Sequence, residues 1–163
     1  MLKIGIIGCG KITEVRHAPE YAENPNCQLA AFFDVVPERA KALAEQYGGV
    51  AYDSIEALLA SDVDAVSVCV ANAYHAQASI QALKAGKHVL CEKPMATTPE
   101  DCEAMVAAAK AAGKFLMIGQ NQRLAKAHVK AREIIASGEM GKVITFETHF
   151  AHPGPEGWTG VRD

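Results

Sequence analysis

The sequence predicts an α/β fold in which one doubly wound parallel sheet is covered by helices on both faces. Short apolar, β-branched runs alternate with Ala-rich stretches of helical periodicity, the pattern of a buried parallel sheet. The first run leads directly into a glycine-rich turn, as a strand does where it meets a helix. The chain has 163 residues, half of them hydrophobic, which is enough for one domain with a sizeable core.

Six strand-and-helix steps follow one another along the chain. Right-handed crossovers between parallel strands then give the strand order 3-2-1-4-5-6. The expected strands cover Leu2–Ile7, Gln28–Asp34, Val50–Tyr52, Ala65–Val70, His88–Cys91 and Phe115–Ile118.

Two of the expected helices carry clear end signals. Pro37 opens the first of them and Gly48 follows its last residue. Thr98 is the expected N-cap of the second, before Pro99 at its first position, and Gly113 is expected to end it. The apolar positions of this second helix, expected to form its buried stripe, are Cys102, Met105, Val106 and Ala109.

The pattern changes towards the end of the chain. We expect a first α/β domain over 1–123, a connecting helix over 124–141, and the start of a further, truncated domain over 142–163. Residues Val143–Phe150 alternate between two sets of side chains, as in a strand with two different faces.

The turn after the first strand has features of a dinucleotide-binding site. Gly8 permits the tight turn, and Gly10 lets backbone approach a pyrophosphate at a helix N-terminus, where free N–H groups and the helix dipole stabilise an anion. Asp34 ends the second apolar run, where a carboxylate accepts hydrogen bonds from an adenosine ribose. These residues indicate that the chain binds NAD.

Two other interpretations of the glycine turn stay open at this point. The two glycines also suit a sharp strand-to-helix turn without any ligand. A methyltransferase that uses S-adenosylmethionine has a similar glycine-rich turn and acidic residue, but it gives Glu92-Lys93-Pro94 no role.

Glu92, Lys93 and Pro94 follow the fifth strand, at the carboxyl edge where ligands of such sheets bind. The Lys93 ammonium is our candidate catalytic group: it suits a hydrogen bond to a substrate hydroxyl or, if neutral, removal of its proton during hydride transfer. Glu92 suits a ribose hydroxyl. A solvated charge pair in a loop is the alternative for both residues.

Further polar residues follow the fourth and sixth strands. Asn72 and His75 are candidate cofactor contacts, although Asn72 is equally suited to capping the next helix. Gln120–Arg123 brings amides and the Arg123 guanidinium to the same edge, groups that bind a carboxamide or sugar hydroxyls.

The composition of the chain limits the kinds of partner and ligand that we expect it to bind. The formal charge is −3 and no block of Lys or Arg stands out, which argues against nucleic acid or an anionic membrane. Five widely spaced cysteines without a C-x-x-C pair favour reduced thiols and a cytoplasmic location. His149 and His152 lack the spacing and the nearby carboxylate of familiar zinc motifs, so we expect no metal site.

Taken together, several of these residues resemble the Gfo/Idh/MocA oxidoreductases, a family that includes glucose-fructose oxidoreductase and inositol 2-dehydrogenase. The Glu92-Lys93-Pro94 tripeptide is the most specific element, and the resemblance covers the first of the two domains of such enzymes. The residues that carry it are Gly8-Cys9-Gly10-Lys11-Ile12, His17, Asp34, Asn72, His75, Glu92-Lys93-Pro94 and Arg123.

The resemblance implies a role for each part of the site. Residues 8–12, including Lys11 and Ile12, would hold the pyrophosphate, Asp34 the adenosine ribose and Glu92 the ribose next to nicotinamide. Lys93 would lie beside the nicotinamide and the substrate carbinol. A carboxylate repels a 2′-phosphate and Val35 cannot pair with one, so NAD is expected rather than NADP. Thr13 departs from the usual Gly or Ala and leaves the helix placement open.

The resemblance also implies a Rossmann fold and hydride transfer between nicotinamide and a sugar, inositol or related polyol. Family members have a second α/β domain that completes the substrate site and often forms the subunit interface. We therefore expect the full-length protein to be a homo-oligomer, and this chain by itself to bind the cofactor without a complete catalytic site. The alternative is a non-catalytic NAD sensor or partner-binding module.

Overall fold

The computed structural model describes residues 1–149 and 151. The chain divides into two compact units, one from Met1 to Gly119 and a second that begins at Gln120.

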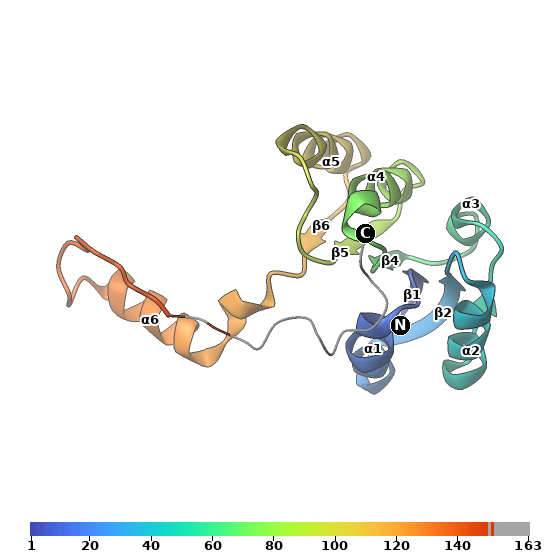
Figure 1. Cartoon of the computed structure of the whole chain (residues 1–163), viewed down its shortest axis with the longest axis horizontal. Helices are drawn as coiled ribbons and strands as arrows, with labels where there is room; N and C mark the ends of the chain where they lie inside the picture. Colours follow the sequence, from blue (N-terminus) through green and yellow to red (C-terminus); the bar gives the residue numbers. More distant parts are fainter. Residues whose placement is uncertain (150, 152–163) are drawn as a thin grey trace. The chain divides into compact units, whose positions relative to one another are not determined.

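The first unit contains a six-stranded sheet with the strand order β3-β2-β1-β4-β5-β6 (Figure 1). Every strand pairing in it is parallel. This confirms the predicted fold class and strand order. The strands are β1 (Leu2–Ile7), β2 (Cys27–Phe33), β3 (Val50–Ala51), β4 (Ala65–Val68), β5 (His88–Cys91) and β6 (Leu116–Ile118).

Helices connect the strands. A short irregular helical turn precedes each of the helices α1, α4 and α6. The turns are the π-helical segment η1 (Thr13–His17) and the 3-10 turns η2 (Asn72–Tyr74) and η3 (Asn121–Leu124). The α-helices of the first unit are α1 (Ala18–Glu23), α2 (Pro37–Tyr47), α3 (Ile55–Leu59), α4 (His75–Lys84) and α5 (Pro99–Ala112). The second unit contains η3 and α6 (Lys126–Ser137).

The two faces of the sheet have separate cores. Ile4 and Ile6 of β1 pack with residues of α1 and α2, whereas Ile7 packs with residues of α3, α4 and α5. Figure 1 shows the two helix groups on opposite faces. The alternation follows from the twofold period of a strand, and it explains why the buried strands read as continuous apolar runs. Burial of a side chain such as Phe32, which is fully enclosed, contributes about 1.5–3 kcal/mol.

The end signals of the helices work as predicted. The Thr98 side chain accepts the backbone N–H of Asp101 at 3.2 Å, and Pro99 stands at the first position of α5. Gly113 ends α5 in the left-handed conformation, and Gly48 ends α2 with φ of 76°. The expected buried stripe of α5 is wrong at one position, because Val106 is 42% exposed while Met105 is fully buried.

The alternating segment near the end of the chain differs from the prediction. The structure assigns no strand to 143–149, and Phe150 lies outside the described residues, as does His152. A strand is held by hydrogen bonds to a neighbour, and within the described part of the chain no strand pairs with this segment. Alternation alone therefore did not produce a strand here.

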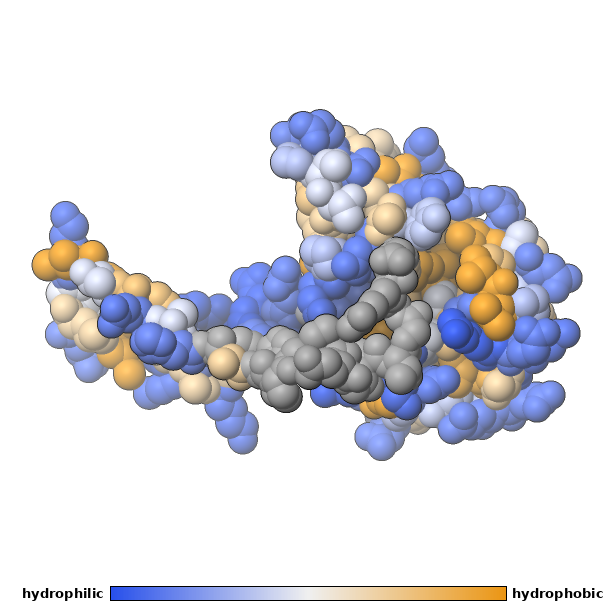
Figure 2. Space-filling view, in the orientation of Figure 1, coloured by the Kyte–Doolittle hydropathy of each residue, from blue (hydrophilic) through white to orange (hydrophobic). Residues whose placement is uncertain are grey.

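The surface seen in Figure 2 is mostly hydrophilic, with hydrophobic residues in separate groups. In the part of the chain that the structure describes, no helix combines the length and the hydropathy required to cross a bilayer.

Candidate functional site

The carboxyl ends of five strands lie level with one another. Ile7 pairs with both Phe33 and Val68, Val68 pairs with Cys91, and Cys91 pairs with Ile118. Parallel pairing thus aligns the residue that follows each strand in a row along one edge of the sheet. The members of this row, which we call the strand-end row, are Gly8, Asp34, Cys69, Glu92 and Gly119.

Gly8 and Gly10 are glycines for different reasons. Gly8 has φ of +99°, and a Cβ there would lie 2.6 Å from the carbonyl carbon and oxygen of Cys69. The close approach of these two backbone segments, together with the positive φ, therefore requires glycine at position 8. A Cβ at Gly10 would have no protein atom within 4 Å. Packing inside the protein does not explain Gly10, whereas close approach of a phosphate to the backbone does.

Thr13 ties the first helix to the glycine loop. Its hydroxyl donates to the Gly8 carbonyl oxygen at 2.6 Å, and its side chain is fully buried. Residues 11–12 are already helical and lead into η1, so one continuous helical segment runs from 11 to 23. Its N-terminus faces the glycine loop, the position that favours an anion. Thr13 therefore fixes the helix through a hydrogen bond where the usual glycine relies on close packing.

Lys11 and Ile12 form the start of this helical segment. Lys11 is exposed, and its ammonium lies 3.5 Å from the Glu14 carboxylate one turn on. Ile12 is half-buried. Both residues lie directly after Gly10, where a pyrophosphate group would meet the helix N-terminus.

Asp34 braces the same loop from the end of β2. Its Oδ2 accepts the Cys9 backbone N–H at 2.7 Å, and its Oδ1 accepts the Val36 backbone N–H at 2.8 Å. The residue is only 8% exposed. The Arg39 guanidinium, on the first turn of α2, lies 4.0 Å from Oδ1. Asp34 is thus an anchored carboxylate with lone pairs left to accept ribose hydroxyls.

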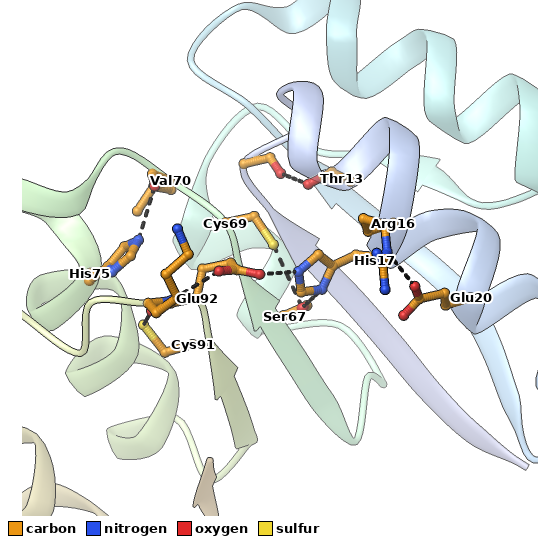
Figure 3. A network of polar contacts seen from close by, with 12 residues as sticks. Thr13, Arg16, His17, Glu20, Ser67, Cys69, Val70, His75, Cys91 and Glu92 are labelled. Atoms are coloured by element: carbon orange, nitrogen blue, oxygen red, sulfur yellow. Dashed lines mark hydrogen bonds and ion pairs between the residues drawn. The ribbon is translucent and has the colours of Figure 1, made fainter. Parts of the chain in front are cut away.

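Glu92 and His17 form a half-buried ion pair at the same edge (Figure 3). His17 ends η1 and Glu92 follows β5, and the His17 Nε2 lies 2.9 Å from Glu92 Oε1. The side chains are only 10% and 18% exposed. The second oxygen, Oε2, accepts the Lys93 backbone N–H at 3.0 Å. The carboxylate is held at both oxygens.

The other side of His17 faces β4. Its Nδ1 lies 2.9 Å from the Ser67 hydroxyl, which lies 3.7 Å from the Cys69 sulfur. Burial lowers the pKa of His17, but hydrogen bonding to Cys69 and Glu92 outweighs burial and raises it to about 10. The hydrogen bond from His17 in turn lowers the pKa of the Glu92 carboxyl. The pair is therefore an imidazolium and a carboxylate at neutral pH.

His75 holds the loop that follows Glu92. Its Nδ1 lies 2.6 Å from the Pro94 carbonyl oxygen and its Nε2 lies 3.1 Å from the Val70 carbonyl oxygen. The side chain is fully buried. His75 therefore links the loop after β4 to the loop after β5, and both ring nitrogens face protein carbonyls instead of an open site. The Lys93 side chain, in the loop after β5, is exposed.

Asn72 and Arg123 are both exposed. Asn72 is exposed at the start of η2, and Tyr74 occupies the N-cap position of α4, so the helix-cap interpretation of Asn72 is wrong. Arg123 lies in η3 of the second unit and is also exposed. Within the described residues, no group of three or more His, Cys, Asp or Glu side chains is arranged to hold a metal ion.

Sequence reasoning missed two parts of the site. It left His17 without a partner, although the pair joins residues 75 positions apart. A polar Ser67 inside the otherwise apolar β4 was the one available signal, because a buried hydroxyl needs a partner. It also missed Arg39, because only the turn into α2 brings the guanidinium towards Asp34.

The residues present fit a dinucleotide. Gly10 at a helix N-terminus leaves room for a phosphate, the anchored Asp34 provides acceptors for one ribose, and Glu92 provides acceptors near the middle of the strand-end row. Asp34, Gly8, Cys69 and Glu92 follow four neighbouring strands of the sheet, in the order β2, β1, β4 and β5.

Comparison with known proteins gives the same assignment. Residues 2–120 match the family model of the Gfo/Idh/MocA oxidoreductases, described as an oxidoreductase family with an NAD-binding Rossmann fold. D-glucoside 3-dehydrogenase of Escherichia coli K12 is 37% identical over 160 residues, which cover 96% of this chain and 46% of that protein. Inositol 2-dehydrogenase of Salmonella paratyphi B is 36% identical over 146 residues, covering 86% and 43%.

A solved structure is similar too. The 3-ketoreductase KijD10 from Actinomadura kijaniata, in complex with NADP and TDP-benzene, superposes with a TM-score of 0.78 at 33% identity. The match covers 84% of this chain and 42% of that one. The chain thus spans less than half the length of the relatives named here, and within that span it belongs to the Gfo/Idh/MocA oxidoreductase family as its NAD(P)-binding Rossmann domain.

Proposed function

We propose that this chain is the cofactor-binding part of an NAD(P)-dependent dehydrogenase that acts on a sugar, inositol or related polyol. The observation that carries the proposal is the strand-end row, which brings the glycine loop, Asp34 and Glu92 to one edge of the sheet. The relatives named above act on glucosides and inositol according to their names, which supports this substrate class.

Each residue of the proposed site has a distinct task. The loop from Gly8 to Ile12 and the helix N-terminus bind the pyrophosphate, and Asp34 binds the adenosine ribose. Glu92 binds the ribose next to nicotinamide, with its carboxylate held by His17 and by the Lys93 backbone. A bound nicotinamide accepts or supplies a hydride. The Lys93 Nζ orients the substrate hydroxyl and exchanges its proton.

We propose NAD as the preferred cofactor. The Asp34 carboxylate is buried against backbone N–H groups and cannot turn away, so it repels a 2′-phosphate. Arg39 works in the opposite direction, because its guanidinium lies near the same carboxylate and suits a phosphate. Asp34 is the buried, anchored charge, whereas the Arg39 side chain is half-exposed, and we therefore expect weaker binding of NADPH than of NADH.

Two other expectations remain proposals. The second domain implied by the family would complete the substrate site and form the interface of a homo-oligomer. The five cysteines are free thiols, which supports a cytoplasmic location.

Calorimetric titration of this chain with NADH tests the proposal. We expect the wild type to bind and Asp34→Ala to bind more weakly, because the variant loses both the ribose acceptors and the brace on the loop at Cys9. Glu45→Ala, an exposed position on α2, is the matched control and should bind like the wild type. Failure of the folded wild type to bind NADH or NADPH would refute the proposal. Binding without turnover of any polyol would leave the sensor alternative standing.

A further inference from the structure

We propose that His17 is a positioning residue that sets the balance between oxidised and reduced cofactor at this site, because it fixes the Glu92 carboxylate and cancels its charge. The inference rests on the proposed function, in which Glu92 lies next to the nicotinamide ribose.

The geometry gives His17 one arrangement. Its Nε2 donates to Glu92 Oε1 at 2.9 Å, and its Nδ1 faces the Ser67 hydroxyl at 2.9 Å. Ser67 is fully buried in β4, so it cannot follow a moving imidazole. His17 itself begins the turn into α1 from the helical segment that contacts the glycine loop. It therefore joins the pyrophosphate end of the site to the nicotinamide end.

The chemistry of hydride transfer makes the charge at Glu92 matter. The nicotinamide ring carries a positive charge in NAD+ and none in NADH. A lone carboxylate beside it would stabilise NAD+ more than NADH, because unit charges several ångströms apart in a partly buried site interact appreciably. The positive charge of the His17 imidazolium offsets that preference. Water screens the pair little, because the two side chains are only 10% and 18% exposed.

His17→Gln separates position from charge. The amide can still donate a hydrogen bond to Glu92, but the positive charge is gone. At pH 8, where a carboxyl is ordinarily ionised, we expect the ratio of the dissociation constants of NADH and NAD+ to rise by roughly five- to tenfold in favour of NAD+. Fluorescence and calorimetric titrations with each cofactor form measure the ratio without any substrate.

The double variant His17→Gln/Glu92→Gln is the control. It removes both charges, so the ratio should return close to the wild-type value even though both cofactor forms bind more weakly. A purely structural role for His17 predicts that both forms weaken equally in His17→Gln and that the second substitution restores nothing.

The wild-type chain supplies an independent measurement that needs no variant to fold. Nitrogen-15 NMR of the histidine side chains should show both His17 ring nitrogens protonated at pH 8. A neutral His17 there, or an unchanged ratio in a folded His17→Gln, would overturn the inference. A wild type that binds neither NAD+ nor NADH would instead overturn the proposed function.

Discussion

The Thr13 hydroxyl donates to the Gly8 carbonyl oxygen at 2.6 Å, and both residues are buried. This contact joins the first helical segment to the loop that leaves β1. The third glycine of a dinucleotide-binding fingerprint serves close packing of helix and strand. Here a β-branched residue occupies that position, and its hydroxyl makes the same connection by a hydrogen bond.

Replacement of Thr13 by Val should therefore destabilise the chain. Val has nearly the same shape but cannot donate, so the buried Gly8 carbonyl loses its partner. We expect a loss of about 1–3 kcal/mol in the free energy of unfolding, measured by urea denaturation. Thr13→Ser keeps the hydroxyl and should lose less. Equal losses in the two variants would show that the methyl group contributes as much as the hydrogen bond.

The two glycines of the loop should respond differently to alanine. Gly8→Ala places a Cβ 2.6 Å from the Cys69 backbone at a positive φ, so we expect a loss of about 2–5 kcal/mol in unfolding free energy. Gly10→Ala meets no protein atom and should change stability by less than about 0.5 kcal/mol. Calorimetry should nevertheless show weaker NADH binding by Gly10→Ala. Unchanged binding would remove Gly10 from the site.

The His17–Glu92 pair should make stability depend on pH. The folded-state pKa of His17 is raised from 6.5 to about 10, so its contribution is complete below pH 6.5 and is lost as pH rises towards 10. The pKa of Glu92 is lowered, so its contribution is complete above its ordinary value of 4.5 and is lost as pH falls. The pair therefore stabilises most between about pH 4.5 and 6.5.

Urea denaturation of the wild type and of His17→Gln at pH 6, 8 and 9.5 measures this effect. The difference in unfolding free energy between the two proteins should shrink as pH rises. Other groups that titrate in this range act in both proteins and cancel in the comparison. A constant difference would mean that the charge of His17 contributes nothing to stability.

The buried cysteines should resist alkylation. Burial raises the pKa of Cys9 to about 12, with Asp34 adding to the effect, and burial raises that of Cys91 to about 11. The thiolate is the reactive form, so both should react slowly at pH 8. Mass spectrometry after iodoacetamide treatment should find the half-buried Cys27 and Cys102 modified first. Early modification of Cys9 would show that the glycine loop opens readily.

Arg39 should matter for NADPH more than for NADH. Its guanidinium is half-exposed and lies 4.0 Å from Asp34, where it is able to meet a 2′-phosphate. We expect Arg39→Ala to weaken NADPH binding severalfold and to leave NADH binding nearly unchanged. Titrations with the two cofactors give the comparison, and equal effects on both would show that Arg39 does not contact the 2′-phosphate.

Local patterns predicted most of the first unit because their causes are local. The caps at Thr98 and Gly113 depend on neighbouring backbone, and the apolar runs depend on burial on both faces. Features that depend on distant partners were not predictable in this way. Val106 is exposed although its neighbour Met105 is fully buried, because tertiary packing decides which side of α5 is covered. Residues 143–149 alternate as a strand does, but no strand is assigned to them.

The same division applies to the site. Gly8, Asp34 and Glu92 were found from their places after strands, because parallel strands end at a common edge. The contacts that hold the site together were not predicted. His17 contacts Glu92 and His75 contacts Pro94, and each contact joins segments that are far apart in sequence.

Because the strands end level with one another, ligand-binding candidates such as Asp34 and Glu92 lie after the strands, whereas the core residues lie within them. Asp34 and Glu92 of the strand-end row each follow a strand whose own side chains fill the core, so these two positions lie outside the hydrophobic pattern of the strands. Insertion of one residue inside β5 would move its later side chains to the opposite face of the sheet and carry Glu92 away from His17. Strand length, more than the identity of any single core residue, keeps the residues of the strand-end row aligned along one edge of the sheet.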